Sequence, residues 1–120
     1  MRLVRWIAAC GVILAACGGG SNGGNPLQPG TPVVADTVTI ADNAFGPAAV
    51  TVSPGGTVTW IWAGVNQHNV QWASGPGTLP AGSTTQASGT PYTVTFSDVG
   101  TYQFQCSVHS NMSGTVFVAQ

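Results

Sequence analysis

Residues 106–112 contain three side chains that commonly bind transition metals. Cys106 offers a thiolate, His109 an imidazole and Met112 a thioether, each three residues from the next. These are the soft and borderline donor types that copper sites use. The chain has one further histidine, His68, so a site that needs a second imidazole must take it from there. We therefore expect a mononuclear copper centre that carries one electron at a time.

Other metals suit this set of donors less well. Structural zinc sites use four strong nitrogen or sulfur ligands, and a thioether is a poor fourth. An iron–sulfur cluster needs more cysteines than this chain provides. Two imidazoles and a thiolate with a weak axial thioether are the ligands of a blue-copper electron-transfer site. Each residue alone has an ordinary alternative, such as a surface histidine, a buried thiol or a methionine that fills the core. The combined spacing favours copper.

Neighbours of these donors are expected to support the site, because the residues around metal ligands orient them. Asn69 directly follows His68 and can join that strand to the ligand loop by hydrogen bonding. Backbone N–H groups near Asn69 and Ser107 are candidates for donors to the sulfur of Cys106.

The N-terminal residues 1–16 have the pattern of a secretory signal. Arg2 and Arg5 precede a short apolar run that is too short for a stable membrane span. The run ends in Leu-Ala-Ala-Cys, which resembles a bacterial lipobox, so Cys17 is expected to carry lipid and become the mature N-terminus. The alternative is an ordinary signal peptide with Cys17 as a free thiol. We predict export and lipid anchoring to a bacterial membrane, facing the periplasm or the cell exterior.

The remaining chain divides into a linker and one domain. Residues 17–35 are rich in glycine and proline and are expected to form a flexible tether. Residues 36–120 are expected to form the copper-binding domain. Cys10 would leave with the signal and Cys17 would carry lipid, so Cys106 would have no disulfide partner. A lone cysteine in an exported domain is a free reactive thiol, one half of an intermolecular disulfide or a metal ligand.

Charge excludes several classes of function. Both arginines lie in residues 1–16, the chain has no lysine, and its only acidic side chains are Asp36, Asp42 and Asp98. Nucleic-acid binding is excluded, because nothing basic remains to neutralise phosphates. Acid–base catalysis by paired carboxylates is disfavoured, because the chain has only these three carboxylate side chains. Docking of partners should depend on apolar contacts and hydrogen bonds, and we expect a monomer.

The domain must position its donors with strands rather than helices. From Asp36 onward, apolar and polar residues alternate with a period of two, and turn-forming residues separate the runs. The apolar members of these runs are Val58, Trp60 and Trp62; Tyr92, Val94 and Phe96; Tyr102, Phe104 and Cys106; and Val116 and Val118. This pattern predicts an all-β Greek-key sandwich or barrel. The polar residues 73–90 are expected to form a long connection with a short edge strand near residues 84–87.

Several motifs together resemble the cupredoxin family, especially its plastocyanin and amicyanin branch. They are Phe45-Gly46-Pro47, Val50-Thr51-Val52 with the following Pro-Gly-Gly-Thr-Val-Thr-Trp, His68-Asn69-Val70, Gly100-Thr101-Tyr102, and the spacing of Cys106, His109, Met112 and Gly114. The resemblance implies an eight-stranded Greek-key sandwich with a type 1 copper bound by His68, Cys106, His109 and Met112. It also implies that electrons enter and leave at the His109 edge, where redox partner proteins would dock.

Four functions compete on this sequence. The leading hypothesis is a membrane-tethered electron carrier that works between redox partners. The second is a protein that stores or delivers copper without a redox role, although such carriers usually have richer methionine and histidine runs. The third is a metal-free β-sandwich used for adhesion or assembly. An enzyme is the weakest option, because two histidines cannot supply the second copper centre of a multicopper oxidase or a nitrite reductase.

Overall fold

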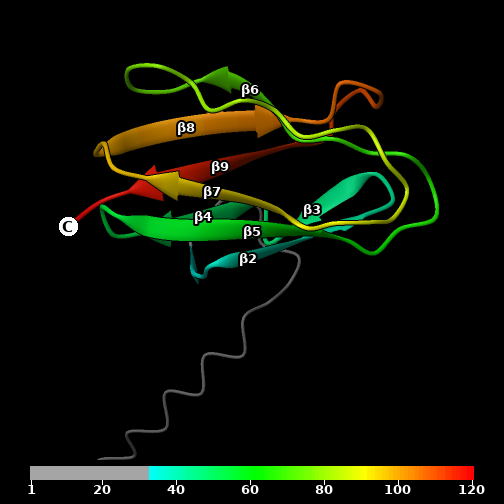
Figure 1. Cartoon of the computed structure of the whole chain (residues 1–120), viewed down its shortest axis with the longest axis horizontal. Coiled ribbons are helices and arrows are strands. Elements are labelled where there is room, and N and C mark those ends of the chain that lie inside the picture. The colour runs from blue at the N-terminus through cyan, green and yellow to red at the C-terminus, as the bar shows by residue number, and fades with distance from the viewer. Residues whose placement is uncertain (1–32) are drawn as a thin grey trace, which may run out of the picture.

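Two β-sheets facing each other make up the protein in the computed structural model, which describes residues 33–120 (Figure 1). The first sheet has the strand order β1-β4-β9-β8-β6 and the second has the order β3-β2-β5-β7. The strands are β1 (Val33–Val34), β2 (Thr37–Ala41), β3 (Ala44–Gly46), β4 (Ala49–Val52), β5 (Gly56–Trp62), β6 (Gln71–Ser74), β7 (Tyr92–Phe96), β8 (Gly100–Gln105) and β9 (Ser113–Val118). The predicted all-β class is confirmed. The predicted signal and the lipidation site at Cys17 lie outside the described residues.

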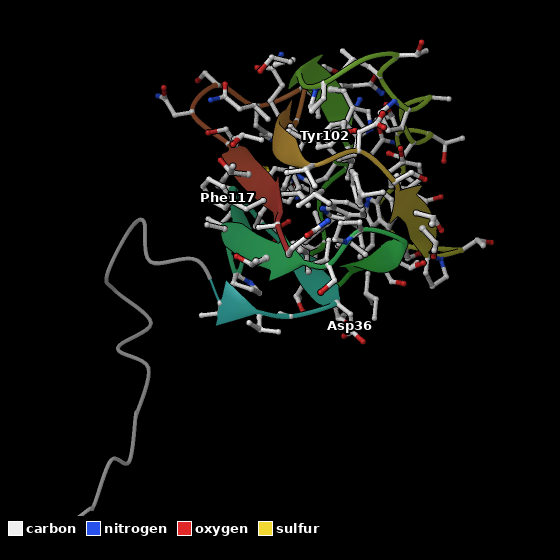
Figure 2. The ribbon with its side chains drawn as sticks, turned by 90° about the vertical axis from the view of Figure 1, so that its left-hand side faces the viewer. Asp36, Tyr102 and Phe117 are labelled. Carbon is white, nitrogen blue, oxygen red and sulfur yellow. The ribbon has the colours of Figure 1, made fainter. Side chains whose placement is uncertain are left out.

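The alternating sequence pattern forms these strands because one side of each sheet faces the other sheet. In β2, Val38 and Ile40 are fully buried while the threonines between and beside them are exposed. In β5, the buried side chains are Val58, Trp60 and Trp62, as the alternation predicted. Viewed along the strands, side chains from both sheets fill the space between them (Figure 2). Burial of this apolar surface is the main force that holds the sheets together.

The outer face of the second sheet is stabilised by polar pairs instead of ion pairs. The hydroxyls of Thr57 and Thr95 lie 2.9 Å apart across β5 and β7, and those of Thr59 and Thr93 lie 3.2 Å apart. Such cross-strand threonine pairs contribute modestly to sheet stability. They keep this face polar in a domain that has almost no charge.

The structure differs from the sequence-based expectation in three details. It has nine strands rather than about eight, because the short β1 pairs in parallel with β4. Val33 and Val34 form β1, so part of the stretch expected to be linker belongs to a strand. The edge strand expected at residues 84–87 is wrong: a single bridge joins Gln86 to His68, because the neighbouring polar residues bond locally or to side chains.

One end of the sandwich collects the segments that matter for the site. The turn between β2 and β3, the connection from β5 to β6 and the loop between β8 and β9 all lie at the end opposite the C-terminus (Figure 1). Residues 33–120 contain no helix long and apolar enough to cross a membrane.

Candidate metal centre

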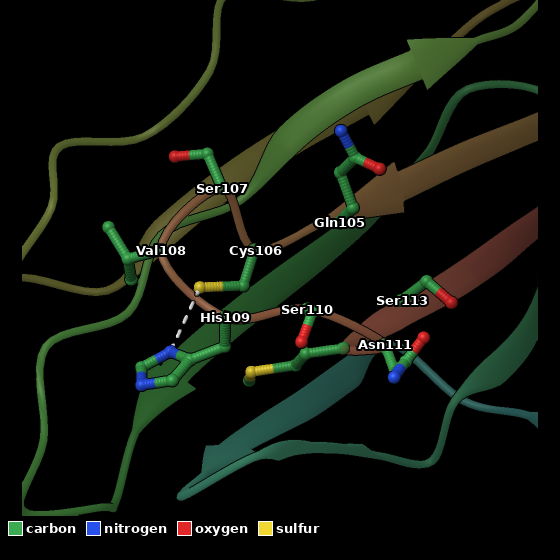
Figure 3. A pocket seen from close by; sticks show the side chains of 9 residues that line it. Gln105, Cys106, Ser107, Val108, His109, Ser110, Asn111 and Ser113 are labelled. Carbon is green, nitrogen blue, oxygen red and sulfur yellow. Dashed lines mark hydrogen bonds between the residues drawn. The ribbon is translucent and has the colours of Figure 1, made fainter.

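The loop between β8 and β9 carries three of the four predicted ligands. The N–H of Cys106 donates to the carbonyl of Met112 over 2.9 Å, which closes the loop at its base. Asn111 has a φ of 62°, a left-handed conformation that asparagine tolerates better than most residues, and it turns the chain back toward β9. Cys106 and Met112 are buried, and His109 is partly exposed. All three line one open hollow, into which the Cys106 sulfur and the His109 ring point (Figure 3).

His68 reaches this loop from the connection between β5 and β6. Its side chain is fully buried. Its backbone forms a two-way bridge with Gln86, with N–H to carbonyl distances of 3.0 Å in both directions. The indole N–H of Trp62 donates to the His68 carbonyl over 2.9 Å. These bonds fix the backbone of His68, so its ring has little freedom to move.

The donor atoms of His68, Cys106 and His109 all lie within 4.8 Å of one another. The sulfur of Cys106 lies 3.9 Å from Nδ1 of His68 and 3.5 Å from Nδ1 of His109. An ion with bonds of about 2.0 Å to nitrogen and about 2.3 Å to sulfur separates its donor atoms by roughly 3.5 Å at tetrahedral angles. The spacing therefore fits a single metal ion. Met112 lines the same hollow and offers a buried thioether, which suits copper better than zinc.

The structure adds a residue that the sequence analysis did not connect with the site. Asp42, in the turn between β2 and β3, accepts a hydrogen bond from Nε2 of His68 over 2.9 Å. This bond, with further bonds from the backbone N–H groups of Asn66 and Val65, lowers the pKa of Asp42 to about 2. The carboxylate is therefore ionised at neutral pH. When the Nε2–H group of the neutral ring is hydrogen-bonded to Asp42, Nδ1 of His68 has its lone pair on the side of Cys106.

Asn69 links the two ligand-bearing segments. Its side-chain amide donates to the hydroxyl of Ser107 over 2.7 Å and to that of Thr85 over 2.9 Å, and its Oδ1 accepts from the Ser107 N–H over 2.8 Å. The Ser107 N–H is thus taken up by Asn69, and it does not donate to the Cys106 sulfur as the sequence analysis considered. The residue is nearly fully buried, so these bonds are shielded from water.

Asn69→Ala is expected to destabilise the domain by about 2 kcal/mol, because it removes three hydrogen bonds and leaves the N–H of Ser107 without its protein acceptor. Urea unfolding of the copper-free protein measures this loss. The matched control is Thr85→Ala, which removes only one of the three hydrogen bonds and should cost about 1 kcal/mol or less. Equal losses in the two variants would show that Asn69 does not support the ligand loop.

A two-sheet Greek-key sandwich with two imidazoles, a thiol and a thioether at one end defines the cupredoxins, a class of copper-binding domains. Comparison of sequences places the chain within that class. Residues 33–119 match the family described as copper binding proteins, plastocyanin/azurin family, and the chain belongs to this family. Its cofactor is copper.

One relative matches nearly the whole length of the chain, and others match a large part of it. The chain is 30% identical to amicyanin-alpha of Methylorubrum extorquens over 119 residues, which cover 98% of this chain and 99% of that protein. It is 37% identical to the plastocyanin of Prochlorothrix hollandica over 81 residues, 62% of each chain. Among solved structures, a reduced Cu(I) form of an amicyanin variant superposes with a TM-score of 0.61 and 29% identity, covering 76% of this chain and 95% of that one.

Proposed function

We propose that this cupredoxin is a one-electron carrier between redox partner proteins, tethered to a bacterial membrane by lipid on Cys17. The proposed copper ligands are His68, Cys106, His109 and Met112. The observation that carries the proposal is the convergence of two imidazole nitrogens and one thiol sulfur within 4.8 Å at one end of a rigid sandwich. Copper bound there supplies a couple between Cu(II) and Cu(I).

The protein's contribution is to hold its donors still. His68 is fixed by its backbone bridge, by Trp62 and by Asp42, and Asn69 fixes the start of the ligand loop through Ser107. Donors that are already in place need little rearrangement when the charge of the metal changes. Little rearrangement favours fast electron transfer in both directions, which is the property that a carrier needs.

Exposure indicates where a partner would dock. His68 is fully buried, whereas His109 is partly exposed and its neighbour Val108 is 50% exposed. Electrons would therefore enter and leave through the His109 edge, where the metal site is closest to solvent. The described residues contain three aspartates and neither lysine nor arginine, so apolar contact and hydrogen bonding would dominate docking.

The experiment that tests this function is an absorption spectrum of the mature domain after copper addition. We expect an intensely blue protein that ascorbate bleaches and that reoxidation by ferricyanide restores over repeated cycles. A colourless and weakly bound Cu(II) adduct would instead favour copper delivery, and an absence of binding would favour a metal-free module. The tether is tested separately: Cys17→Ser should release the protein from the membrane fraction of an expressing bacterium.

A further inference from the structure

We propose that Asp42 is a positioning residue of the copper centre, which fixes the ring of His68 and lowers the reduction potential of the site. The inference rests on the proposed function, because it requires His68 to be a ligand. Its structural basis is the set of hydrogen bonds that the carboxylate of Asp42 accepts from the ring of His68 and from the backbone that leads to it. No other carboxylate among residues 33–120 forms an ion pair with a histidine.

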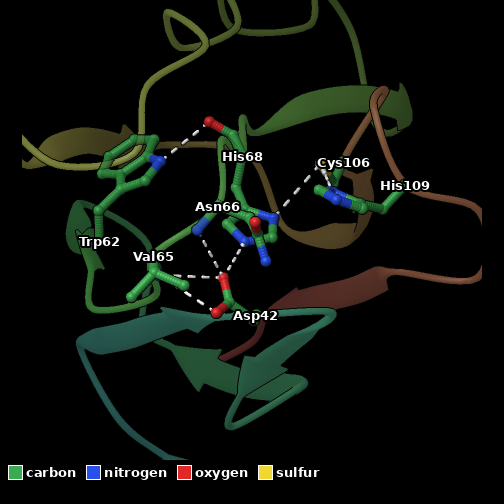
Figure 4. A network of polar contacts seen from close by, with 7 residues as sticks. All are labelled: Asp42, Trp62, Val65, Asn66, His68, Cys106 and His109. Carbon is green, nitrogen blue, oxygen red and sulfur yellow. Dashed lines mark hydrogen bonds and ion pairs between the residues drawn. The ribbon is translucent and has the colours of Figure 1, made fainter.

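Asp42 is held by three donors that converge on the same carboxylate (Figure 4). Its Oδ1 accepts from Nε2 of His68 and from the N–H of Asn66, each over 2.9 Å. The N–H of Val65 lies 3.1 Å from Oδ1 and 3.2 Å from Oδ2. Two of the donors are backbone groups of the segment that leads to His68. Asp42 thus holds the ring and the approaching chain together.

The backbone around Asp42 is shaped to allow this contact. Asp42 and Asn43 form the two-residue turn between β2 and β3, and Asn43 has a φ of 64°, a left-handed conformation that asparagine adopts more readily than most residues. On the facing segment, a Cβ atom on Gly64 would lie 2.3 Å from Oδ1 of Asp42 and 2.9 Å from its backbone nitrogen. Only glycine leaves room for the carboxylate at this position.

The contact determines which nitrogen of His68 is available. Asp42 is ionised and can only accept, so Nε2 must carry the proton. Nδ1 then presents its lone pair toward the sulfur of Cys106, 3.9 Å away. The ring itself is fully buried, whereas the carboxylate side chain is 30% exposed. The arrangement is a carboxylate–histidine pair of the kind that fixes the tautomer and the ring orientation of metal ligands.

The sign of the effect on the potential follows from charge. The oxidised site carries one more positive charge than the reduced site, and the negative carboxylate lies one imidazole ring away from the donor Nδ1. It therefore stabilises Cu(II) more than Cu(I). Removing the negative charge should raise the reduction potential.

The first test is Asp42→Asn, which keeps an acceptor oxygen and nearly the same shape while it removes the charge. The variant should lower the affinity for Cu(II) relative to Cu(I) by about tenfold, within the range for loss of such partners, which is a rise of about 59 mV for one electron. The control is Asp36→Asn, at the other end of β2, where the same loss of charge does not touch His68. A potential for Asp42→Asn equal to that of the wild type would overturn the proposal.

A second measurement separates this inference from the proposed function, because it needs no copper. Nitrogen-15 NMR of the metal-free protein should show His68 with its proton on Nε2 in the wild type. Gly64→Ala, which keeps the charge but pushes the carboxylate away, should give a mixture of the two tautomers. An unchanged His68 spectrum in Gly64→Ala would contradict the positioning role even if the protein is blue. A colourless wild type with the expected spectrum would contradict the carrier function alone.

Discussion

Replacing Cys106 with serine is expected to abolish the blue colour of the copper-loaded protein and to weaken Cu(II) binding by at least a hundredfold. The thiolate is the soft donor of the set, and the interaction between copper and this sulfur gives a blue-copper site its character. A serine hydroxyl at the same position stays protonated at neutral pH and is a poor ligand for both Cu(II) and Cu(I). Visible absorption and a competition titration for Cu(II) against a chelator measure the two effects.

A matched variant shows whether the loss of colour and of Cu(II) affinity is caused by removal of the sulfur or by damage to the loop. Ser110→Ala changes a residue of the same loop that is exposed and carries none of the proposed donor atoms. It should keep its colour and its affinity. Cys106→Ser should still fold, because the buried hydroxyl costs only about 1–3 kcal/mol without a partner. A Cys106→Ser protein that stays blue would refute the assignment of Cys106 as a ligand.

Sequence alone predicted the faces of the strands, because alternation is a local property. Val58, Trp60 and Trp62 had to lie on one side of any strand they formed, and this side had to be buried. The pairing of β5 in parallel with β2 was not predictable in the same way, since it depends on segments that lie about 20 residues apart. The short β1 was missed because its two valines follow a run rich in glycine and proline, where little in the sequence distinguishes an edge strand from a linker.

The residues of the candidate site likewise differ in whether local sequence could predict them. Cys106, His109 and Met112 were found because a short loop brings residues at this spacing together, and His68 was found because the chain has no other histidine to offer. Asp42 was missed because its partner lies 26 residues further along the chain. The pair Asp42-Asn43 between two alternating runs does predict a tight turn. It carries no sign that the carboxylate turns inward to an imidazole instead of outward to water.

Phe104 lies at the centre of the aromatic core beneath the copper site. Its side chain is 1% exposed, and its ring packs edge-on against Phe45 at 4.8 Å, Trp60 at 5.3 Å and Trp72 at 5.7 Å between centroids. A Cβ atom on Gly114 would lie 2.3 Å from the Phe104 ring, so the neighbouring strand β9 is also shaped around it. The ring therefore joins the two sheets at a point two residues before Cys106.

Phe104→Ala should destabilise the copper-free domain by about 3–5 kcal/mol, because a core already packed around this ring cannot collapse into the space it leaves. That is a large part of the roughly 5–15 kcal/mol that stabilises a domain. The measurement is urea unfolding followed by tryptophan fluorescence. The control is Phe117→Ala, on the neighbouring strand β9, where the side chain is only partly buried on the outer face and the loss should be about 1 kcal/mol (Figure 2). Equal losses of stability in the two variants would show that the aromatic cluster around Phe104 does not hold the two sheets together. The positions of the proposed copper ligands would then depend on the hydrogen bonds of the loop alone.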